Sequence, residues 1–131
     1  RRAMGHLLGN AVRLTPHDDI LVVGEGIETM LSLFEAAPGL PVWAALSSGH
    51  LGAVLLPEDL QRLYIAIDRD PAGQRAAERL SARATEVGIA AQVLEPLLGD
   101  FNDDLQANGR LALRQHLAGQ IGLEDRHRLL G

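Results

Sequence analysis

Two short apolar runs, each followed at once by acidic residues, constrain the fold of this chain most strongly. Residues 20–23 are continuously apolar and are followed by Glu25, and residues 63–67 are continuously apolar and are followed by Asp68 and Asp70. Strands that are buried on both faces of a parallel sheet have this character. Ligands of open α/β sheets bind just beyond the carboxyl ends of such strands. We therefore expect the three carboxylates to converge on one edge of a parallel sheet, where they can hold a divalent metal ion.

Strand-like and helix-like segments alternate along the rest of the chain. We expect strands over residues 20–23, 42–46, 63–67 and 89–94, and helices over residues 27–37, 51–56, 71–87 and 105–117. This alternation predicts an α/β fold, a parallel four-stranded sheet with helices on both faces. The expected organisation is an amino-terminal arm with one short edge strand (residues 1–19), one domain (residues 20–118) and a tail without a clear pattern (residues 119–131).

Composition excludes several classes of function. The chain has no cysteine, which rules out disulfides, thiolate metal sites and cysteine nucleophiles. Its net charge of -5 argues against a strongly basic nucleic-acid clamp that acts alone. No apolar run reaches transmembrane length and no signal peptide is recognisable, so we expect a cytoplasmic protein with no membrane partner. Because the chain begins with Arg1, we also expect it to be a piece of a longer protein.

The acidic residues admit a catalytic and a structural interpretation. Mg²⁺ prefers oxygen ligands, and one or two carboxylates with substrate phosphates suffice to hold it. Asp68 and Asp70 would face the same side of an extended segment, and Asp100 and Asn102 form a later oxygen-rich loop. Asp70 also precedes a proline, which is the pattern of a helix N-cap. We expect Asp104 to be a solvated acid in the first turn of a helix.

These motifs resemble those of the Toprim family, the metal-binding catalytic fold shared by primases, topoisomerases and some nucleases and recombination proteins. The resemblance covers about Arg13 to Leu105 and is carried by four segments: residues 24–29 (the glutamate motif), 45–51 (a small glycine-containing loop), 67–73 with Ala76-Ala77 (the DxD motif in its primase form) and 99–103 (the late acidic motif). With residues 41–46 added, the chain looks most like the Toprim domains of plasmid, phage and integrated-element primases or primase-helicases. One departure is Gly99, where the family commonly has lysine.

The resemblance implies a Toprim-like (Rossmann-like) fold and magnesium- or manganese-dependent nucleotidyl transfer in primer synthesis for DNA replication. Glu25 would be the general acid/base or a metal-proximal carboxylate. Asp68 and Asp70 would be metal ligands, and Asp100 and Asn102 would complete the metal site. The implied partners are a single-stranded DNA template, nucleoside triphosphates and neighbouring primase or helicase domains, which the domain would need for activity.

Arginines near these motifs are candidates for binding substrate phosphates, because arginine binds phosphate through two parallel hydrogen bonds. We expect Arg69 and Arg75 to contact substrate, together with Ser48 and Gly49 of the second loop. Arg75 and Arg79 are four residues apart on one helix face, so a solvated surface is an equally good interpretation.

Two alternatives stay open. A Toprim nuclease would use the same carboxylates with water as the nucleophile, and a degenerate Toprim module would serve as a non-catalytic scaffold in replication or recombination. Tyr64, the only tyrosine, lies inside an expected buried strand, which argues against strand passage through a tyrosine nucleophile. A zinc-ribbon Cys/His set and a Walker motif are both absent from these residues, so they do not contain a complete primase or helicase.

Overall fold

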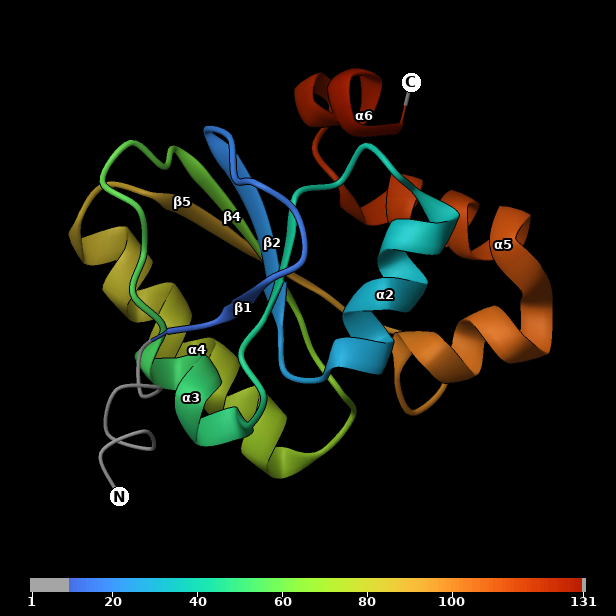
Figure 1. The fold of residues 1–131 in the computed structure, drawn as a ribbon, viewed down its shortest axis with the longest axis horizontal. Helices are drawn as coiled ribbons and strands as arrows, with labels where there is room; N and C mark the ends of the chain where they lie inside the picture. Colours follow the sequence, from blue (N-terminus) through green and yellow to red (C-terminus); the bar gives the residue numbers. More distant parts are fainter. Residues whose placement is uncertain (1–9, 131) are drawn as a thin grey trace.

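A five-stranded sheet lies between two layers of helices in the computed structural model, which describes residues 10–130 (Figure 1). The strands are β1 (Val12–Arg13), β2 (Ile20–Gly24), β3 (Val42–Ala44), β4 (Arg62–Ala66) and β5 (Ala90–Leu94). They lie in the order β1-β3-β2-β4-β5; β2 to β5 are parallel, and β1 pairs antiparallel with β3. The expected parallel four-stranded sheet is confirmed, and β1 adds an antiparallel edge strand. Residues 1–9 of the expected arm lie outside the described residues.

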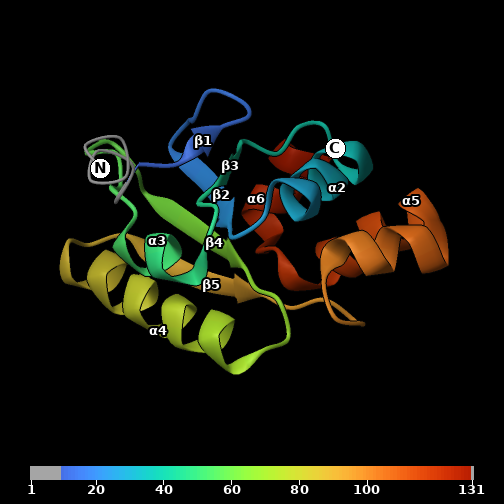
Figure 2. The same cartoon turned by 60° about the horizontal axis from the view of Figure 1, so that its bottom comes forward.

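Each face of the sheet is covered by its own set of helices (Figure 2). The helices α2 (Ile27–Ala36), α5 (Phe101–Gln120) and α6 (Leu123–Leu130) pack on one face, and α3 (Ser48–Ala53) and α4 (Pro71–Glu86) pack on the other. None of the helices in the described part of the chain combines the length and the apolar character needed to cross a membrane.

The central strand β2 shows why the apolar runs are continuous. Ile20 and Val22 join the core cluster under α2 and α5, whereas Leu21 and Val23 join the cluster under α3 and α4. All four side chains are completely buried. A strand with a hydrophobic layer on both faces needs apolar residues at every position, which is why the run was recognisable from the sequence.

Two helices begin earlier than the sequence periodicity predicts, because each starts at a side-chain cap. The Ser47 hydroxyl accepts a hydrogen bond from the backbone nitrogen of His50 at 3.0 Å and begins α3 at Ser48, not at residue 51. The Asp100 carboxylate accepts one from the backbone nitrogen of Asp103 at 2.8 Å and begins α5 at Phe101, not at residue 105. Caps of this kind stabilise a helix by about 1 kcal/mol. α5 is interrupted at Gly109, where the backbone is not helical.

The tail, whose sequence shows no clear pattern, contains a helix, α6, over residues 123–130. Leu129 and Leu130 insert into the core cluster beside α2 and α5. The remaining anchor is polar: Asp125, only 2% exposed, binds Arg62 and Tyr64 of β4. A helix that docks through two leucines and a buried acid lacks the apolar stripe that periodicity analysis detects.

Candidate metal centre

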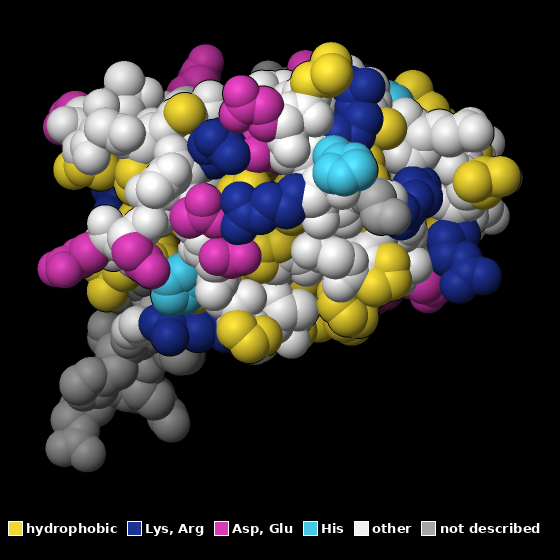
Figure 3. Space-filling model, turned by 90° about the horizontal axis from the view of Figure 1, so that it is seen from above, with side chains coloured by type: hydrophobic (Ala, Val, Ile, Leu, Met, Phe, Trp, Pro, Cys, Tyr) yellow, Lys and Arg dark blue, Asp and Glu magenta, His cyan; other side chains and the backbone are white. Residues whose placement is uncertain are grey.

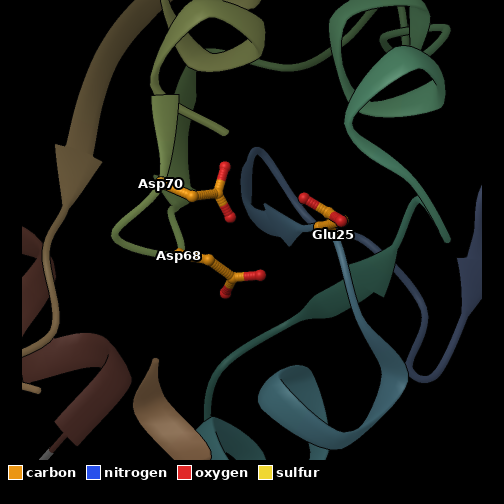
Figure 4. A group of neighbouring side chains, drawn as sticks. All are labelled: Glu25, Asp68 and Asp70. Carbon is orange, nitrogen blue, oxygen red and sulfur yellow. The ribbon is translucent and has the colours of Figure 1, made fainter. Parts of the chain in front are cut away.

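Strand register brings the acidic residues after β2 and β4 to the same level. Gly24 pairs with Ala66, so both strands end together at the carboxyl edge of the sheet. Glu25 follows one strand directly, and Asp68 and Asp70 follow the other. Each of the three side chains offers a carboxylate oxygen, and these oxygens lie within 4.8 Å of one another. Figure 4 shows the three carboxylates turned toward a shared space beyond the strand ends.

The negative charges of Glu25, Asp68 and Asp70 are not compensated by a neighbouring cation in the described part of the chain. Burial raises the pKa of Asp68 to about 6, and the charges of Glu25, Asp100, Asp70 and Asp103 add to the effect. Burial, followed by the charge of Asp70, raises the pKa of Glu25 as well. No ion pair among the described residues joins an arginine or histidine to these three carboxylates. Three acids held together without a cation are typical of a functional site.

An unpartnered oxygen of Asp68 indicates that these residues fit a metal ion. Asp68 Oδ1 is buried and has no hydrogen-bond partner. A buried oxygen without a partner is costly and therefore rare, and it calls for an explanation such as an ion. Carboxylate oxygens are the ligands that Mg²⁺ and Mn²⁺ prefer. The donor set formed by Glu25, Asp68 and Asp70 therefore fits a divalent metal ion.

Asp70 combines the two interpretations that the sequence left open. Its Oδ1 accepts a hydrogen bond from the backbone nitrogen of Gly73 at 2.6 Å and thereby caps α4, which begins at Pro71. The second oxygen takes no part in the cap. Gly73 favours this arrangement, because a Cβ at that position would lie 3.2 Å from both the Asp68 carbonyl oxygen and Asp70 Oδ1, a tight contact. The helix cap thus fixes the position of the acid instead of competing with its use as a ligand.

The later oxygen-rich loop lies near the three carboxylates but is not grouped with them. Asp100 caps α5 through the same carboxylate that contributes to the raised pKa of Asp68. The Asn102 side-chain oxygen accepts a hydrogen bond from Ser32 at 3.1 Å, which ties α5 to α2, and one from Gln106 of α5 itself at 3.4 Å. The roles of Asp100 and Asn102 as metal ligands stay predictions.

Arg69, expected to bind substrate, makes contacts within the fold. Its Nε and Nη2 donate hydrogen bonds to the Pro96 carbonyl oxygen at 2.9 and 2.7 Å, and its backbone nitrogen donates to the Gly99 carbonyl oxygen at 2.8 Å. These bonds fasten the loop after β5 to the loop that carries Asp68 and Asp70. The contacts give Arg69 a role in positioning the acidic loops, and its contact with substrate stays a prediction.

The other expected substrate residues come together between α3 and α4. Ser48, Gly49 and Arg75 line one hollow between α3 and α4, and Arg79 lines it with them. The sequence placed these residues in separate motifs, and only the packing of α3 on α4 reveals that they are neighbours.

The expectation that Asp104 is a solvated acid is wrong. Its side chain is 1% exposed, and its two oxygens accept hydrogen bonds from the backbone nitrogens of Leu97 and Leu98, both at 2.8 Å. Asp104 therefore holds the loop that leads from β5 to α5. Its position in the first turn of a helix, which suggested exposure, gives no signal of this bonding across the loop.

Comparison with known proteins agrees with this geometry. Residues 20–110 match the family model described as the Toprim domain. No curated protein matches the chain. Among solved structures, the primase fragment of the bacteriophage T7 primase-helicase protein is similar at a TM-score of 0.62 and 20% identity, over 83% of this chain and 46% of that one. The Aquifex aeolicus primase structure (zinc-binding and RNA polymerase domains) is similar at a TM-score of 0.56 and 22% identity, over 82% of this chain and 27% of that one. The chain thus spans less than half of either solved protein.

Proposed function

The chain belongs to the Toprim family, and we propose that it is the catalytic domain of a DNA primase-like protein that makes primers by divalent-metal-dependent nucleotidyl transfer. The observation that carries this proposal is the group of three uncompensated carboxylates, Glu25, Asp68 and Asp70, at the carboxyl ends of two adjacent parallel strands. The likeness of the fold to two primase structures favours primer synthesis over other Toprim activities.

In the proposed reaction the 3′-hydroxyl of the primer attacks the α-phosphate of a nucleoside triphosphate, a phosphodiester bond forms and pyrophosphate leaves. Glu25 accepts the hydroxyl proton, since its raised pKa lies closer to neutral pH, where a general base is most efficient. Asp68 and Asp70 would hold the metal ion, with Asp100 and Asn102 as further ligands. A bound Mg²⁺ or Mn²⁺ would offset the negative charge that develops on the phosphoryl oxygens.

The template in this proposal is single-stranded DNA held mainly by neighbouring domains. The chain has a net charge of -5, so it lacks most of the electrostatic attraction that dominates affinity for nucleic acid. We expect primer synthesis by the isolated chain to be undetectable or very slow, because positioning of two substrates supplies much of the rate of such a transfer.

The test is a primer-synthesis assay with a longer protein that contains this chain, single-stranded DNA, nucleoside triphosphates and Mg²⁺. Glu25→Gln keeps the shape of the side chain and removes the base, so we expect activity to fall by about 10²- to 10⁴-fold with little change in thermal melting. Glu58→Gln, a change of the same chemistry at an exposed position, is the matched control and should retain activity.

Two outcomes contradict the proposal. Full primer synthesis by the Glu25→Gln protein excludes Glu25 as the base. Metal-dependent cleavage of nucleic acid without any synthesis by the unaltered protein assigns the same carboxylates to a Toprim nuclease, in which water is the nucleophile.

A further inference from the structure

A groove between α3 and α4 carries two arginines that no acidic residue neutralises. It has a volume of about 230 Å³ and is lined by Ser48, Gly49, Ala72, Arg75, Ala76 and Arg79. Figures 1 and 2 show α3 lying alongside α4 on the face of the sheet opposite α5. No carboxylate lines this groove, although acidic residues outnumber basic ones in the chain as a whole, 17 to 12.

The two arginines differ from most others in the described part of the chain. Six arginines donate side-chain hydrogen bonds within the fold: Arg62, Arg69, Arg83, Arg114, Arg126 and Arg128. Arg75 and Arg79 are exposed and make no hydrogen bond or ion pair with any described residue. Glu78, the acid next to Arg79 in α4, pairs with neither of them. Their guanidinium groups are therefore free to bind a ligand.

One of these arginines, Arg79, lies directly against α3. A Cβ at Gly52 would lie 3.2 Å from Arg79 Nη1 and 3.3 Å from Arg79 Cζ, so the guanidinium group lies against the glycine of α3. Arg83, one turn further along α4, donates a hydrogen bond from Nη1 to the Gly52 carbonyl oxygen at 2.8 Å and fixes the two helices together. Small residues at Gly49, Ala72 and Ala76 leave the space in front of the arginines open.

The groove runs along α4, the helix whose first turn is capped by an acid of the metal centre. Asp70, one of the three carboxylates, caps the first turn of α4, and Arg75 and Arg79 follow five and nine residues later on the same helix. At 1.5 Å per residue, the two arginines lie about 7.5 and 13.5 Å along the helix axis from Asp70. They are separated from each other by one helical turn, so the groove leads away from the carboxylates.

We propose that the α3–α4 groove is a phosphate-binding site in which Arg75 and Arg79 hold phosphate groups that extend from the metal centre. Arginine suits this ligand because its planar donors match phosphate oxygens in pairs. The assignment of these phosphates to a substrate rests on the proposed function. Their source is either the phosphate tail of a nucleoside triphosphate or the backbone of a nucleic-acid strand, and both present the same chemistry to the groove.

The experiment measures binding to this chain directly, at low salt and with a chelator present so that no catalysis takes place. The two probes are inorganic tripolyphosphate, measured by calorimetry, and a labelled single-stranded dodecathymidylate, measured by fluorescence anisotropy. The variant is Arg75→Ala/Arg79→Ala. The matched control is Arg110→Ala, which removes an equally exposed arginine from α5 on the other face of the sheet. Thermal melting verifies that both variants are folded, as expected for exposed side chains.

We expect the double variant to lose at least fivefold in affinity for one or both probes, while Arg110→Ala loses less than twofold. Loss of tripolyphosphate binding alone identifies the nucleotide tail as the ligand. Loss of oligonucleotide binding alone identifies the strand, and the slope of log K against log salt should then fall by about 1.4, as two released counterions require. Equal affinities of the double variant and Arg110→Ala for both probes, or no binding of either probe by the unaltered chain, would overturn the proposal.

The same experiment separates this inference from the proposed function. Asp68→Asn/Asp70→Asn removes the metal ligands and should bind both probes at least as well as the unaltered chain, because it removes negative charge beside the groove. A groove that binds phosphate in a protein that makes no primers would contradict the proposed function only. If the unaltered protein makes primers but the Arg75→Ala/Arg79→Ala variant keeps full affinity for both probes, the result would contradict only the proposal that the groove binds phosphate.

Discussion

Two aspartates at opposite ends of strand β4 show how differently this fold treats negative charge. Asp125 lies beside the start of the strand, is 2% exposed and contacts Arg62 Nη2 at 2.6 Å and the Tyr64 hydroxyl at 2.6 Å. Asp68 follows the end of the strand, is half-buried among other carboxylates, and forms no ion pair with a described residue.

The same contrast is visible across the two ends of the molecule. Figure 3 views the end that carries α6, where arginine and acidic side chains lie side by side, whereas Figure 4 shows three acids facing one another. A buried acid with its cation fixes a structural contact, while clustered acids without one lower stability and persist for function. The comparison predicts that removing the two aspartates has opposite effects on stability.

The largest effect on stability is expected at the paired aspartate. Asp125→Ala leaves the Arg62 guanidinium and the Tyr64 hydroxyl without their acceptor and should lower the free energy of unfolding by about 3–5 kcal/mol. Urea denaturation measures this difference. Glu124→Gln, at the neighbouring residue whose side chain is 89% exposed, should change it by less than about 0.5 kcal/mol. Equal small effects at both positions would show that Asp125 does not anchor α6.

A smaller loss is expected for Tyr64→Phe. The tyrosine hydroxyl donates to Asp125 Oδ2 at 2.6 Å and accepts from the Gly122 backbone nitrogen at 3.1 Å, while its ring packs in the core. The variant keeps the ring and loses a hydrogen bond to a charged group, so we expect a cost of about 1.5 kcal/mol in urea denaturation. In the Asp125→Ala background the same change should cost much less, because the two groups act together. Additive costs would contradict that coupling.

The unpaired aspartate should give a small change of the opposite sign. The folded-state pKa of Asp68, about 6, is above the value of about 3.9 expected in the unfolded chain, so the folded protein loses stability as pH rises from about 4 to 6 and carries the full cost above 6. With allowance for solvent screening this cost is on the order of 1 kcal/mol. Asp68→Asn should therefore raise the melting temperature by about 3–5 °C at pH 8 without metal, and by almost nothing at pH 4. A large drop in melting temperature at pH 8 would instead make Asp68 a structural residue.

The strands and the carboxylate group could be predicted because short, contiguous stretches of sequence specify them. The apolar runs before Glu25 and Asp68 identified β2 and β4, and their parallel pairing then required the carboxylates to meet. Ser47 and Asp100 were readable as caps, so the early starts of α3 and α5 could have been found in the same way.

The features that were missed depend on contacts between distant segments. Asp125 anchors helix α6 to Tyr64 and Arg62, which lie 61 and 63 positions earlier in the sequence. No local sequence pattern encodes contacts between residues so far apart. The arginines of the DxD region could not be sorted by sequence, because their difference lies in what each side chain meets: Arg69 meets the Pro96 carbonyl oxygen, whereas Arg75 and Arg79 meet an open groove.

A titration of the isolated chain with Mn²⁺ at pH 7.5, followed by electron paramagnetic resonance, tests most directly whether the unpaired carboxylates form a metal site. The unaltered chain should bind with a dissociation constant on the order of 1 mM, because few protein ligands are offered without substrate phosphate. Asp68→Asn/Asp70→Asn should abolish this binding, while Glu58→Gln/Glu86→Gln, which removes two exposed carboxylates elsewhere, should retain it. Binding by Asp68→Asn/Asp70→Asn as tight as that of the unaltered chain would contradict the account.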